Sequence, residues 1–287
     1  MAVLVIGASS QIGHFLLPRL AAASTKVVAL SRQPRSAKTH VEWMRGELPD
    51  FFPPMEGFEG IISFGPLRAL AEWLAKQDKA PAPRLVATSS MSAVSKQASV
   101  VPSEVALAND LQQGEQEVIR QCERLGMGWT LLRPTLIYGA GLDKSLTRLA
   151  RRALRWHVFP IPAATGLRQP VHADDVAQAA LRALGSSNGL KQVFELGGGE
   201  RLTAEAMFRR VSGSLPGRVL RIPLGVTLQS MMRLLPSARG PLSRLETDLV
   251  ADNGPIEKAL GITPRPFRPR AEMWVTDDPP HKSMRVA

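Results

Sequence analysis

The chain has 287 residues, of which 44% are hydrophobic and 21% are charged, so it can bury a sizeable core as one large domain or two smaller ones. No uninterrupted apolar run is long enough to cross a bilayer, and the N-terminal apolar segment lacks the basic lead of a signal peptide. Cys122 is the single cysteine, which excludes an internal disulfide, and we expect a cytoplasmic protein.

The formal net charge of +11 would suit a nucleic-acid partner. However, the chain has one tyrosine and only 5% aromatic residues, so stacking platforms for bases are scarce. The sequence shows no helix-turn-helix or zinc spacing, and we expect no specific nucleic-acid partner. A basic surface also suits a phosphorylated cofactor, an acidic ligand or an anionic membrane face.

Short apolar runs alternate with longer amphipathic stretches along the first half of the chain. This alternation is typical of βαβ units, and it predicts an α/β fold with a doubly wound parallel sheet of the Rossmann type. The expected strands are Val3–Ile6, Lys26–Ser31, Val41–Met44, Gly60–Gly65, Arg84–Thr88 and Trp129–Leu132, and the expected helices are Gln11–Ala23 and Ser103–Leu125.

The pattern changes after Pro134, where prolines, glycines and arginines become frequent. Residues 169–184 then restore a strand-like start and a helix, and Val193–Leu196 predicts one more strand. We therefore expect a dinucleotide-binding sheet domain over residues 1–139, with strand segments of about 169–197 returning to it. Residues 140–168 and 198–280 would form a smaller C-terminal substrate lobe, and residues 281–287 a tail that frays.

The first crossover, VLVIGASSQIGHFLL, runs from a strand through small residues into a helix. Gly7 and Gly13 allow a tight turn, and the free N–H groups at the helix start can face a pyrophosphate. The middle glycine of a G-x-x-G-x-x-G pattern is replaced by Ser10, which can still donate through its backbone N–H. The alternative is an ordinary tight strand–helix turn.

The second strand ends in Ser31 and Arg32, where NAD-binding proteins place an acidic residue toward the ribose hydroxyls. An arginine with a neighbouring hydroxyl attracts a 2′-phosphate instead. The pattern therefore favours NADP(H), with NAD(H) second. The alternative is a solvated loop arginine.

Three later segments carry a family resemblance. They are LLRPTLIYGAG at 131–141, RQPVHADDVAQAALRAL at 168–184 and FELGGGERLTAEAMFRRV at 194–211. Each resembles a segment of the extended short-chain dehydrogenases/reductases, the NAD-dependent epimerase/dehydratase superfamily, and they follow one another in the family's order. The resemblance covers most of the chain up to about Ser214. It implies a Rossmann fold, a nicotinamide cofactor and the chemistry of reductases, epimerases or dehydratases.

The resemblance also implies the residues that contact the cofactor. Those of the turn would line the pyrophosphate, Glu47 and Leu48 would meet the adenine, and Thr88 and Ser89 would lie beneath the nicotinamide ribose. The full set of cofactor residues is Gly7, Ser9, Ser10, Gln11, Ile12, Gly13, Ser31, Arg32, Glu47, Leu48, Phe64, Gly65, Pro66, Thr88, Ser89, Pro134 and Leu136.

Family chemistry uses a serine, a tyrosine and a lysine, the last two four residues apart on one helix face. Ser90 matches the serine. Anchoring the helix on Glu115 and Arg133 places Leu107 and Leu111 at the tyrosine and lysine positions. Neither leucine can transfer a proton, and both would make the cleft apolar. Two interpretations remain: an atypical reductase or epimerase on a small apolar carbonyl substrate, or a catalytically silent dinucleotide-binding sensor or accessory protein.

Few other residues could supply the missing chemistry. Lys96 could reach the site or lie in solvent, and His172 could donate a proton or orient its strand end. Arg168 matches an arginine that grips a substrate phosphate in nucleotide-sugar enzymes. We read Asp174 as the N-cap of the following helix. The five histidines are scattered without a metal-ligand spacing, and we expect no metal.

Residues 143–162 form a basic amphipathic stretch that could lie on an anionic membrane face or pack its leucines inside the substrate lobe. Together with residues 168–177, this region also resembles the dinucleotide-binding accessory subunit of respiratory complex I, which lacks a conventional active site. The sequence leaves open the substrate, a homodimer and lipid contact.

Overall fold

The computed structural model describes residues 2–36, 39–50, 57–225 and 244–274. Its centre is a seven-stranded sheet in the order β11-β6-β5-β4-β1-β2-β3, and every neighbouring pair is parallel. The direction of winding reverses between β1 and β4, so the sheet is doubly wound, as predicted. The strands are β1 (Ala2–Ile6), β2 (Lys26–Ser31), β3 (Val41–Arg45), β4 (Gly60–Ser63), β5 (Arg84–Thr88), β6 (Gly128–Pro134) and β11 (Gln192–Leu196).

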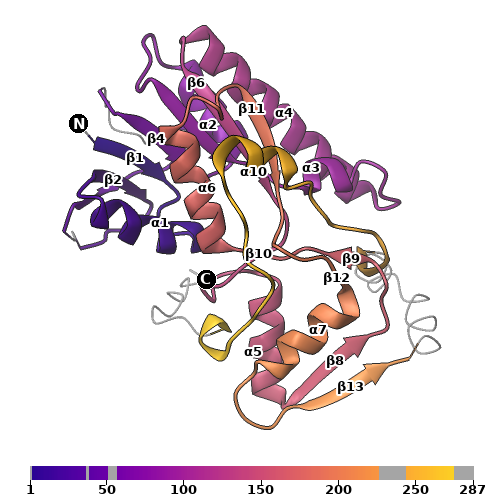
Figure 1. Ribbon diagram of the computed structural model, residues 1–287. Helices are drawn as coiled ribbons and strands as arrows, with labels where there is room; N and C mark the ends of the chain where they lie inside the picture. Colours follow the sequence, from indigo (N-terminus) through magenta and orange to yellow (C-terminus); the bar gives the residue numbers. More distant parts are fainter. Residues whose placement is uncertain (1, 37–38, 51–56, 226–243, 275–287) are drawn as a thin grey trace, which may run out of the picture.

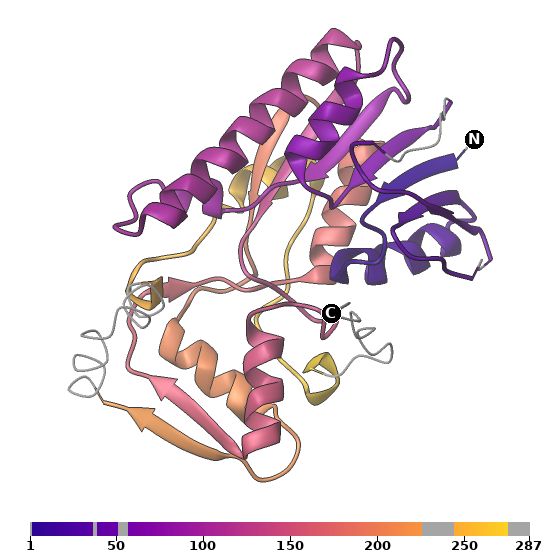
Figure 2. The ribbon, with the colours of Figure 1, turned by 180° about the vertical axis from the view of Figure 1, so that it is seen from behind.

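Helices cover both faces of this sheet (Figures 1 and 2). Val3 and Val5 of β1 pack with α1 (Gln11–Ala22) and α6 (Ala173–Gly185). Leu4 and Ile6, which point the other way, pack with α2 (Leu67–Ala75) and α4 (Pro102–Arg124). Burial on both faces explains why the strands are continuous apolar runs rather than alternating ones.

A smaller lobe lies beyond the carboxyl ends of the strands (Figure 1). It contains α5 (Leu146–Trp156), α7 (Ala204–Gly213), the 3-10 turn η1 (Ala271–Trp274) and the parallel pair β8 (Val158–Pro162) and β13 (Leu220–Leu224). Its core is built around Tyr138, Phe159, Phe267 and Trp274, all buried.

Short elements join the sheet domain to the lobe. The strand β7 (Ile137–Tyr138) pairs with β10 (Val171–His172), and β9 (Leu167–Arg168) pairs with β12 (Leu202–Thr203). The one-turn helix α3 (Ser92–Ser95) follows β5.

Two differences from the sequence expectations concern packing. Residues 254–260, expected in the lobe, form α10 (Gly254–Leu260), and its Ile256 and Leu260 pack against the α6 side of the sheet. The N-cap of α6 is His172 rather than Asp174, because the His172 Nδ1 accepts a hydrogen bond from the Asp174 N–H at 3.1 Å. The expected tail at 281–287 lies outside the described residues.

Candidate functional site

A cleft of about 990 Å³ opens at the carboxyl ends of the central strands, where the direction of winding reverses. In doubly wound sheets this is the position at which ligands bind. The cleft brings together most of the residues singled out in the sequence, from six separate segments. They are Gly7, Ser9, Ser10, Gln11, Ser31, Arg32, Glu47, Leu48, Phe64, Gly65, Pro66, Ser90 and Leu136.

The turn after β1 depends on its two glycines. Gly7 has a φ of +72°, and a Cβ there would lie about 3.1 Å from the Phe64 backbone. A Cβ on Gly13 would meet the Ala8 carbonyl oxygen at 2.1 Å, which real structures do not tolerate. The Ser10 Oγ caps α1 by accepting from the Gly13 N–H at 3.2 Å. The backbone therefore comes close to the cleft at the N-terminus of α1, as anion binding requires.

Ile12 belongs to the turn but differs from the expectation that it lines the cleft. Its side chain is buried in the core beneath the sheet, and Gly13 is buried as well. Ile12 therefore offers only its backbone to the turn.

Gln11 supplies an unsatisfied polar atom at the site. Its Nε2 donates to the Ile137 carbonyl at 3.5 Å, whereas its Oε1 is buried without a hydrogen-bond partner. A buried acceptor without a partner costs free energy and calls for a donor. A ligand hydroxyl, such as one on a ribose, has the required chemistry. The Ser89 hydroxyl is a second buried polar atom without a partner.

The outer rim of the cleft carries opposite charges. Arg32, just past β2, has its Nη1 3.7 Å from the Glu47 Oε1, and their side chains are 77% and 62% exposed. Ser31 is buried, and its Oγ accepts from the Gln33 N–H at 3.2 Å. The guanidinium of Arg32 is thus accessible to an anionic ligand, while Glu47 competes for it.

Ser90 lies in the wall of the cleft, two residues past β5. Its Oγ accepts from the Ser92 N–H at 3.1 Å, which leaves the hydroxyl hydrogen available to a ligand. Thr88 and Ser89 end β5 nearby, and Pro134 ends β6, but these three residues are not among those that line the cleft.

An ion pair joins the two residues on which the alignment of α4 was anchored. Arg133 donates to Glu115 through Nε at 2.9 Å and Nη2 at 2.5 Å. Neither leucine, however, lines the cleft, and Leu107 is 42% exposed. The expectation that these leucines make the cleft apolar is therefore not met in this structure.

Apolar lining comes instead from an adjoining cavity of about 550 Å³ between the sheet domain and the lobe. The two spaces share Ser92, Leu136, Ser145 and Leu249. The apolar side chains around the second cavity come mainly from the lobe, and they are Leu146, Leu149, Met207, Phe208 and Leu245.

One wall of this adjoining cavity is charged. The Glu104 carboxylate lies 3.4 Å from the Lys96 Nζ and 3.0 Å from the Arg244 Nε, and it accepts from the Ser99 hydroxyl at 2.6 Å. Burial raises the pKa of Glu104, but the Ser99 hydrogen bond and the two cations outweigh it, so the pKa is lowered. Lys96 is therefore held in an ion pair at the cavity wall rather than in bulk solvent.

Arg168 lines the same cavity, but its guanidinium is largely committed to backbone. It donates to the carbonyls of Leu167 and Thr247 at 2.7 Å each, and also to that of Arg244. Burial lowers its pKa. The sequence suggested that Arg168 binds a substrate phosphate. In the structure its guanidinium instead holds residues 244–249 in place at the wall of the cavity.

The two remaining candidates for proton transfer are buried. Burial lowers the pKa of His172 to about 4, and its Nδ1 is occupied in capping α6. Burial raises the pKa of Tyr138, the only tyrosine, to about 12. Neither group titrates near neutral pH, which favours structural roles for both.

Asp174 belongs to a network that ties three segments together. It pairs with Arg19 of α1 at 2.6 Å and with Arg265 at 2.7 Å, and Arg265 also pairs with Asp175 at 2.8 Å. Burial raises the pKa of Asp174, but hydrogen bonds from both arginines outweigh it and lower the pKa to about 2. The two aspartates are thus structural ion-pair partners rather than catalytic acids.

Sequence reasoning missed several residues of the cleft. Asp143, Lys144 and Ser145 enter from the lobe, and Leu249 enters from the segment before α10. No motif marks these residues, because only the closure of the lobe over the strand ends brings them to the site.

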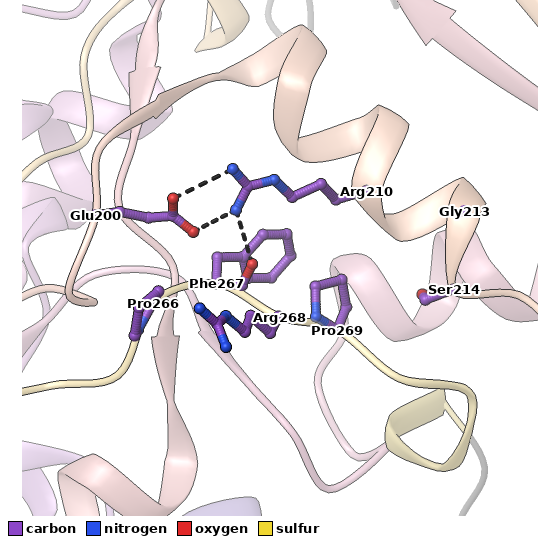
Figure 3. Close-up of a pocket in the computed structure, with 8 residues that line it drawn as sticks. All are labelled: Glu200, Arg210, Gly213, Ser214, Pro266, Phe267, Arg268 and Pro269. Carbon is purple, nitrogen blue, oxygen red and sulfur yellow. Dashed lines mark hydrogen bonds and ion pairs between the residues drawn. The ribbon is translucent and has the colours of Figure 1, made fainter.

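The lobe has a separate, shallow hollow near the end of α7 (Figure 3). Figure 3 shows the Arg210 guanidinium paired with the Glu200 carboxylate and donating to the Phe267 carbonyl, the latter at 2.9 Å. The hollow shares no lining residue with the cleft, and its one carboxylate, Glu200, is already paired with Arg210. We therefore do not assign the cofactor or substrate to it.

Two searches of the described residues gave negative results. Within residues 2–36, 39–50, 57–225 and 244–274, no group of three His, Cys, Asp or Glu side chains could hold a metal ion. In the same residues, no helix combines the length and apolar character needed to cross a membrane.

Comparison with known proteins agrees with this geometry. The sequence profile of the NAD dependent epimerase/dehydratase family matches residues 67–197. No curated protein is similar enough in sequence to count as a match.

Solved structures share the fold over nearly the whole chain. MoeE5 in complex with UDP-glucuronic acid and NAD has a TM-score of 0.71 at 20% identity, covering 93% of this chain and 95% of its own. UDP-glucuronic acid 4-epimerase from Bacillus cereus in complex with NAD has a TM-score of 0.71 at 14% identity. This match covers 96% of the present chain and 94% of the epimerase chain. UDP-glucose 4-epimerase from Thermotoga maritima with UDP-glucose has a TM-score of 0.67 at 17% identity, and the match covers 96% of each chain. The profile match and the shared fold confirm the resemblance to the NAD-dependent epimerase/dehydratase superfamily that the sequence motifs predicted.

Proposed function

We propose that this protein binds a nicotinamide dinucleotide, NADP(H) in preference to NAD(H), in the cleft at the ends of β1, β2 and β4. The observation that carries the proposal is the turn after β1. Gly7 and Gly13 bring backbone N–H groups to the mouth of a cleft of about 990 Å³, at the N-terminus of α1. The NAD complexes of MoeE5 and of the Bacillus cereus epimerase, which share the fold, support a nicotinamide dinucleotide as the ligand, whereas only Arg32 supports the preference for NADP(H).

We assign each part of the dinucleotide to a group of residues in the cleft. The pyrophosphate lies on the turn from Gly7 to Gln11, and a ribose hydroxyl donates to the unsatisfied Gln11 Oε1. Arg32 faces a 2′-phosphate, while Leu48 borders the adenine. The nicotinamide end lies toward Leu136 and Ser90, where the cleft joins the apolar cavity.

If the protein is an enzyme, it acts as an atypical reductase or epimerase on a small, apolar carbonyl compound. The bound dinucleotide supplies or accepts a hydride. Ser90 would donate a hydrogen bond from its hydroxyl to the carbonyl oxygen of the substrate and so polarise it. The proton that the product oxygen takes up on reduction would come from solvent water. The adjoining cavity, with its leucines, methionine and phenylalanine, holds the body of the substrate.

A second function is favoured by the missing proton-transfer groups. By the alignment with the family, Leu107 and Leu111 would stand at the tyrosine and lysine positions, and Tyr138 and His172 are buried and do not titrate near neutral pH. These features fit a protein that binds the dinucleotide without turning it over, as a sensor or an accessory subunit.

Binding and turnover measurements separate the two functions. NADPH and NADH are titrated by fluorescence, and NADPH oxidation is then followed with a panel of carbonyls and quinones. Turnover that falls about 100-fold in Ser90→Ala, with unchanged NADPH affinity, supports the enzyme. The exposed Ser187→Ala variant is the matched control. Tight binding without turnover supports the silent protein, and no binding of either dinucleotide contradicts both.

A further inference from the structure

The end of the lobe farthest from the sheet domain presents an apolar surface. The register of the β8–β13 pair places Leu220 beside Val158 and Ile222 beside Pro160. These four residues share one face of the pair, because side chains of parallel strands in register point the same way. The other face carries Phe159 and Ile161, which are buried in the lobe core next to α5 and α7.

This outer face is exposed among the described residues. Leu220 is 64% exposed and Ile222 is 39% exposed, and Pro160 is exposed as well. Trp156, the last residue of α5, is 64% exposed. It lies next to the pair, since the His157 carbonyl accepts from the Leu220 N–H at 2.8 Å. Trp156, Val158, Pro160, Leu220 and Ile222 form what we term the lobe tip.

The two chain segments that form α5 and the lobe tip carry positive charge only. Residues 146–162 and 211–225 contain six arginines and no aspartate or glutamate. Arg152 and Arg155 of α5, together with Arg218 and Arg221, are exposed. The nearby carboxylates Glu200 and Glu205 of the α7 region are already paired with Arg210 and Arg209.

The amphipathic helix α5 does not itself offer an apolar face. Leu146, Ala150 and Ala153 are buried in the lobe core, and Leu149 and Leu154 pack against it. The arginines cover the outward side of the same helix. Contact with lipid therefore cannot occur by burying the apolar face of α5, as some interfacial helices do. It would use the lobe tip beyond the C-terminus of the helix.

We propose that the lobe tip binds the surface of an anionic lipid bilayer. Tryptophan at an interface places its ring at headgroup level, and leucine and isoleucine insert beside it. Arginines around an apolar patch pair with lipid phosphates, and each contributes about fivefold to partitioning onto an anionic surface. The tip lies at the far end of the lobe from the strand ends, so the cleft stays open when the protein is bound (Figure 1).

Vesicle binding by the full chain tests the proposal. We expect sedimentation with vesicles of phosphatidylcholine containing 30% phosphatidylglycerol, at about 150 mM salt, and little with phosphatidylcholine alone. The Arg152→Ala/Arg155→Ala/Arg218→Ala variant should bind at least tenfold more weakly. A matched variant, Lys26→Ala/Lys79→Ala/Arg120→Ala, removes three exposed charges from the sheet domain and should bind within threefold of the parent.

Apolar substitutions distinguish insertion from simple charge attraction. Leu220→Ser/Ile222→Ser should weaken vesicle binding about tenfold, whereas Val94→Ser, at a 42% exposed position of α3, should not change it. Equal losses in the two charge variants, or no loss in Leu220→Ser/Ile222→Ser, would overturn the proposal. Thermal unfolding of each variant verifies that it is folded.

The environment of Trp156 gives an independent readout. Its fluorescence should shift to shorter wavelength on binding to vesicles, and Trp156→Phe should remove that shift while keeping most of the binding. A parent protein that is dimeric by sedimentation, and becomes monomeric in Leu220→Ser/Ile222→Ser, would instead place a second copy on the tip. Retention of the parent protein on duplex DNA, lost in the Arg152→Ala/Arg155→Ala/Arg218→Ala variant, would likewise identify nucleic acid rather than lipid as the partner of the tip.

Discussion

Single residues at the rim of the cleft decide which dinucleotide it accepts. Arg32 and Glu47 lie 3.7 Å apart at the ends of neighbouring strands, and both side chains are largely exposed. A 2′-phosphate near Arg32 would gain from the guanidinium and lose from the carboxylate. The proposed preference for NADP(H) therefore depends on both residues, and the arginine alone does not fix it.

Opposite substitutions at this rim should have opposite effects. Arg32→Ala should weaken NADPH binding about tenfold and NADH binding by less than twofold, because only NADPH carries the extra phosphate. Glu47→Gln should strengthen NADPH binding a few-fold by removing a repulsive charge. Dissociation constants by fluorescence titration test both changes. An equal loss for NADH and NADPH in Arg32→Ala would reject the assignment of the 2′-phosphate.

Some residue roles could be predicted from the sequence, and others could not. Gly7 and Gly13 were predictable because only glycine fits the turn that they make. Arg168 was not, because its role depends on carbonyls near residues 244–247, more than 70 positions away in the chain. The same holds for Asp174, whose position suggested a cap but whose carboxylate pairs with Arg19 and Arg265.

At the scale of elements, the Asp174 network links α1, α6 and the segment after α10. The pKa of Asp174 is lowered from 3.8 to about 2 in the folded protein. Its contribution to stability is complete above about pH 5, where the carboxylate is ionised in both the folded and the unfolded state. As the pH falls from about 5 to 2, the unfolded chain takes up the proton first, so stability declines. The loss amounts to about 2 kcal/mol.

Asp174→Asn should lower the free energy of unfolding at pH 7 by about 3 kcal/mol, because it leaves two arginines with one carboxylate between them. The difference from the parent should shrink between pH 4 and pH 2. Urea unfolding at several pH values measures both effects. Glu205→Gln, in an exposed ion pair with Arg209, is the control and should change stability by less than about 1 kcal/mol. A difference that does not depend on pH would contradict the role of the carboxylate charge.

His172 causes a second decline in folding stability, at higher pH than the one caused by Asp174. Urea unfolding at several pH values can separate the two. Its pKa falls from 6.5 to about 4 on folding, so between these values the unfolded chain binds a proton that the folded protein does not. Stability therefore decreases as the pH drops from about 6.5 to 4. This decline should persist in Asp174→Asn, because the His172 Nδ1 accepts from the backbone N–H at that position.

The sequence predicted elements well where their burial is regular. The strands of the sheet are apolar runs, because helices cover both faces, and α1, α4 and α6 follow the expected ranges closely. We did not predict α2, although Leu67, Leu70, Ala71 and Leu74 have helical spacing and are buried. The strands β8 and β13 could not be recognised in the sequence, because prolines and arginines interrupt them. Their exposed face is also apolar, so they lack the alternation of apolar and polar residues expected of a half-buried strand.

At the scale of the whole molecule, the sheet domain has a fold shared with many proteins, and the lobe supplies the residues that make the site particular to this chain. The lobe closes over the strand ends, joins an apolar cavity to the cleft and supplies Asp143, Lys144 and Leu249. The sequence indicated the existence of the lobe but not this closure, since it depends on contacts between segments far apart in the chain. The cleft residues at the ends of β1, β2 and β4 were predictable from local motifs, whereas those that the lobe supplies were not.

The central claim is that the turn after β1 holds a nicotinamide dinucleotide. Isothermal titration calorimetry with NADPH and NADH tests it most directly, with Gly13→Val as the control, because a side chain there collides with the Ala8 carbonyl. We predict one site per chain in the parent protein, tighter for NADPH than for NADH, and at least 100-fold weaker binding of both in a folded Gly13→Val variant. No heat with either dinucleotide, and no rise in Tm on adding them, would contradict the account.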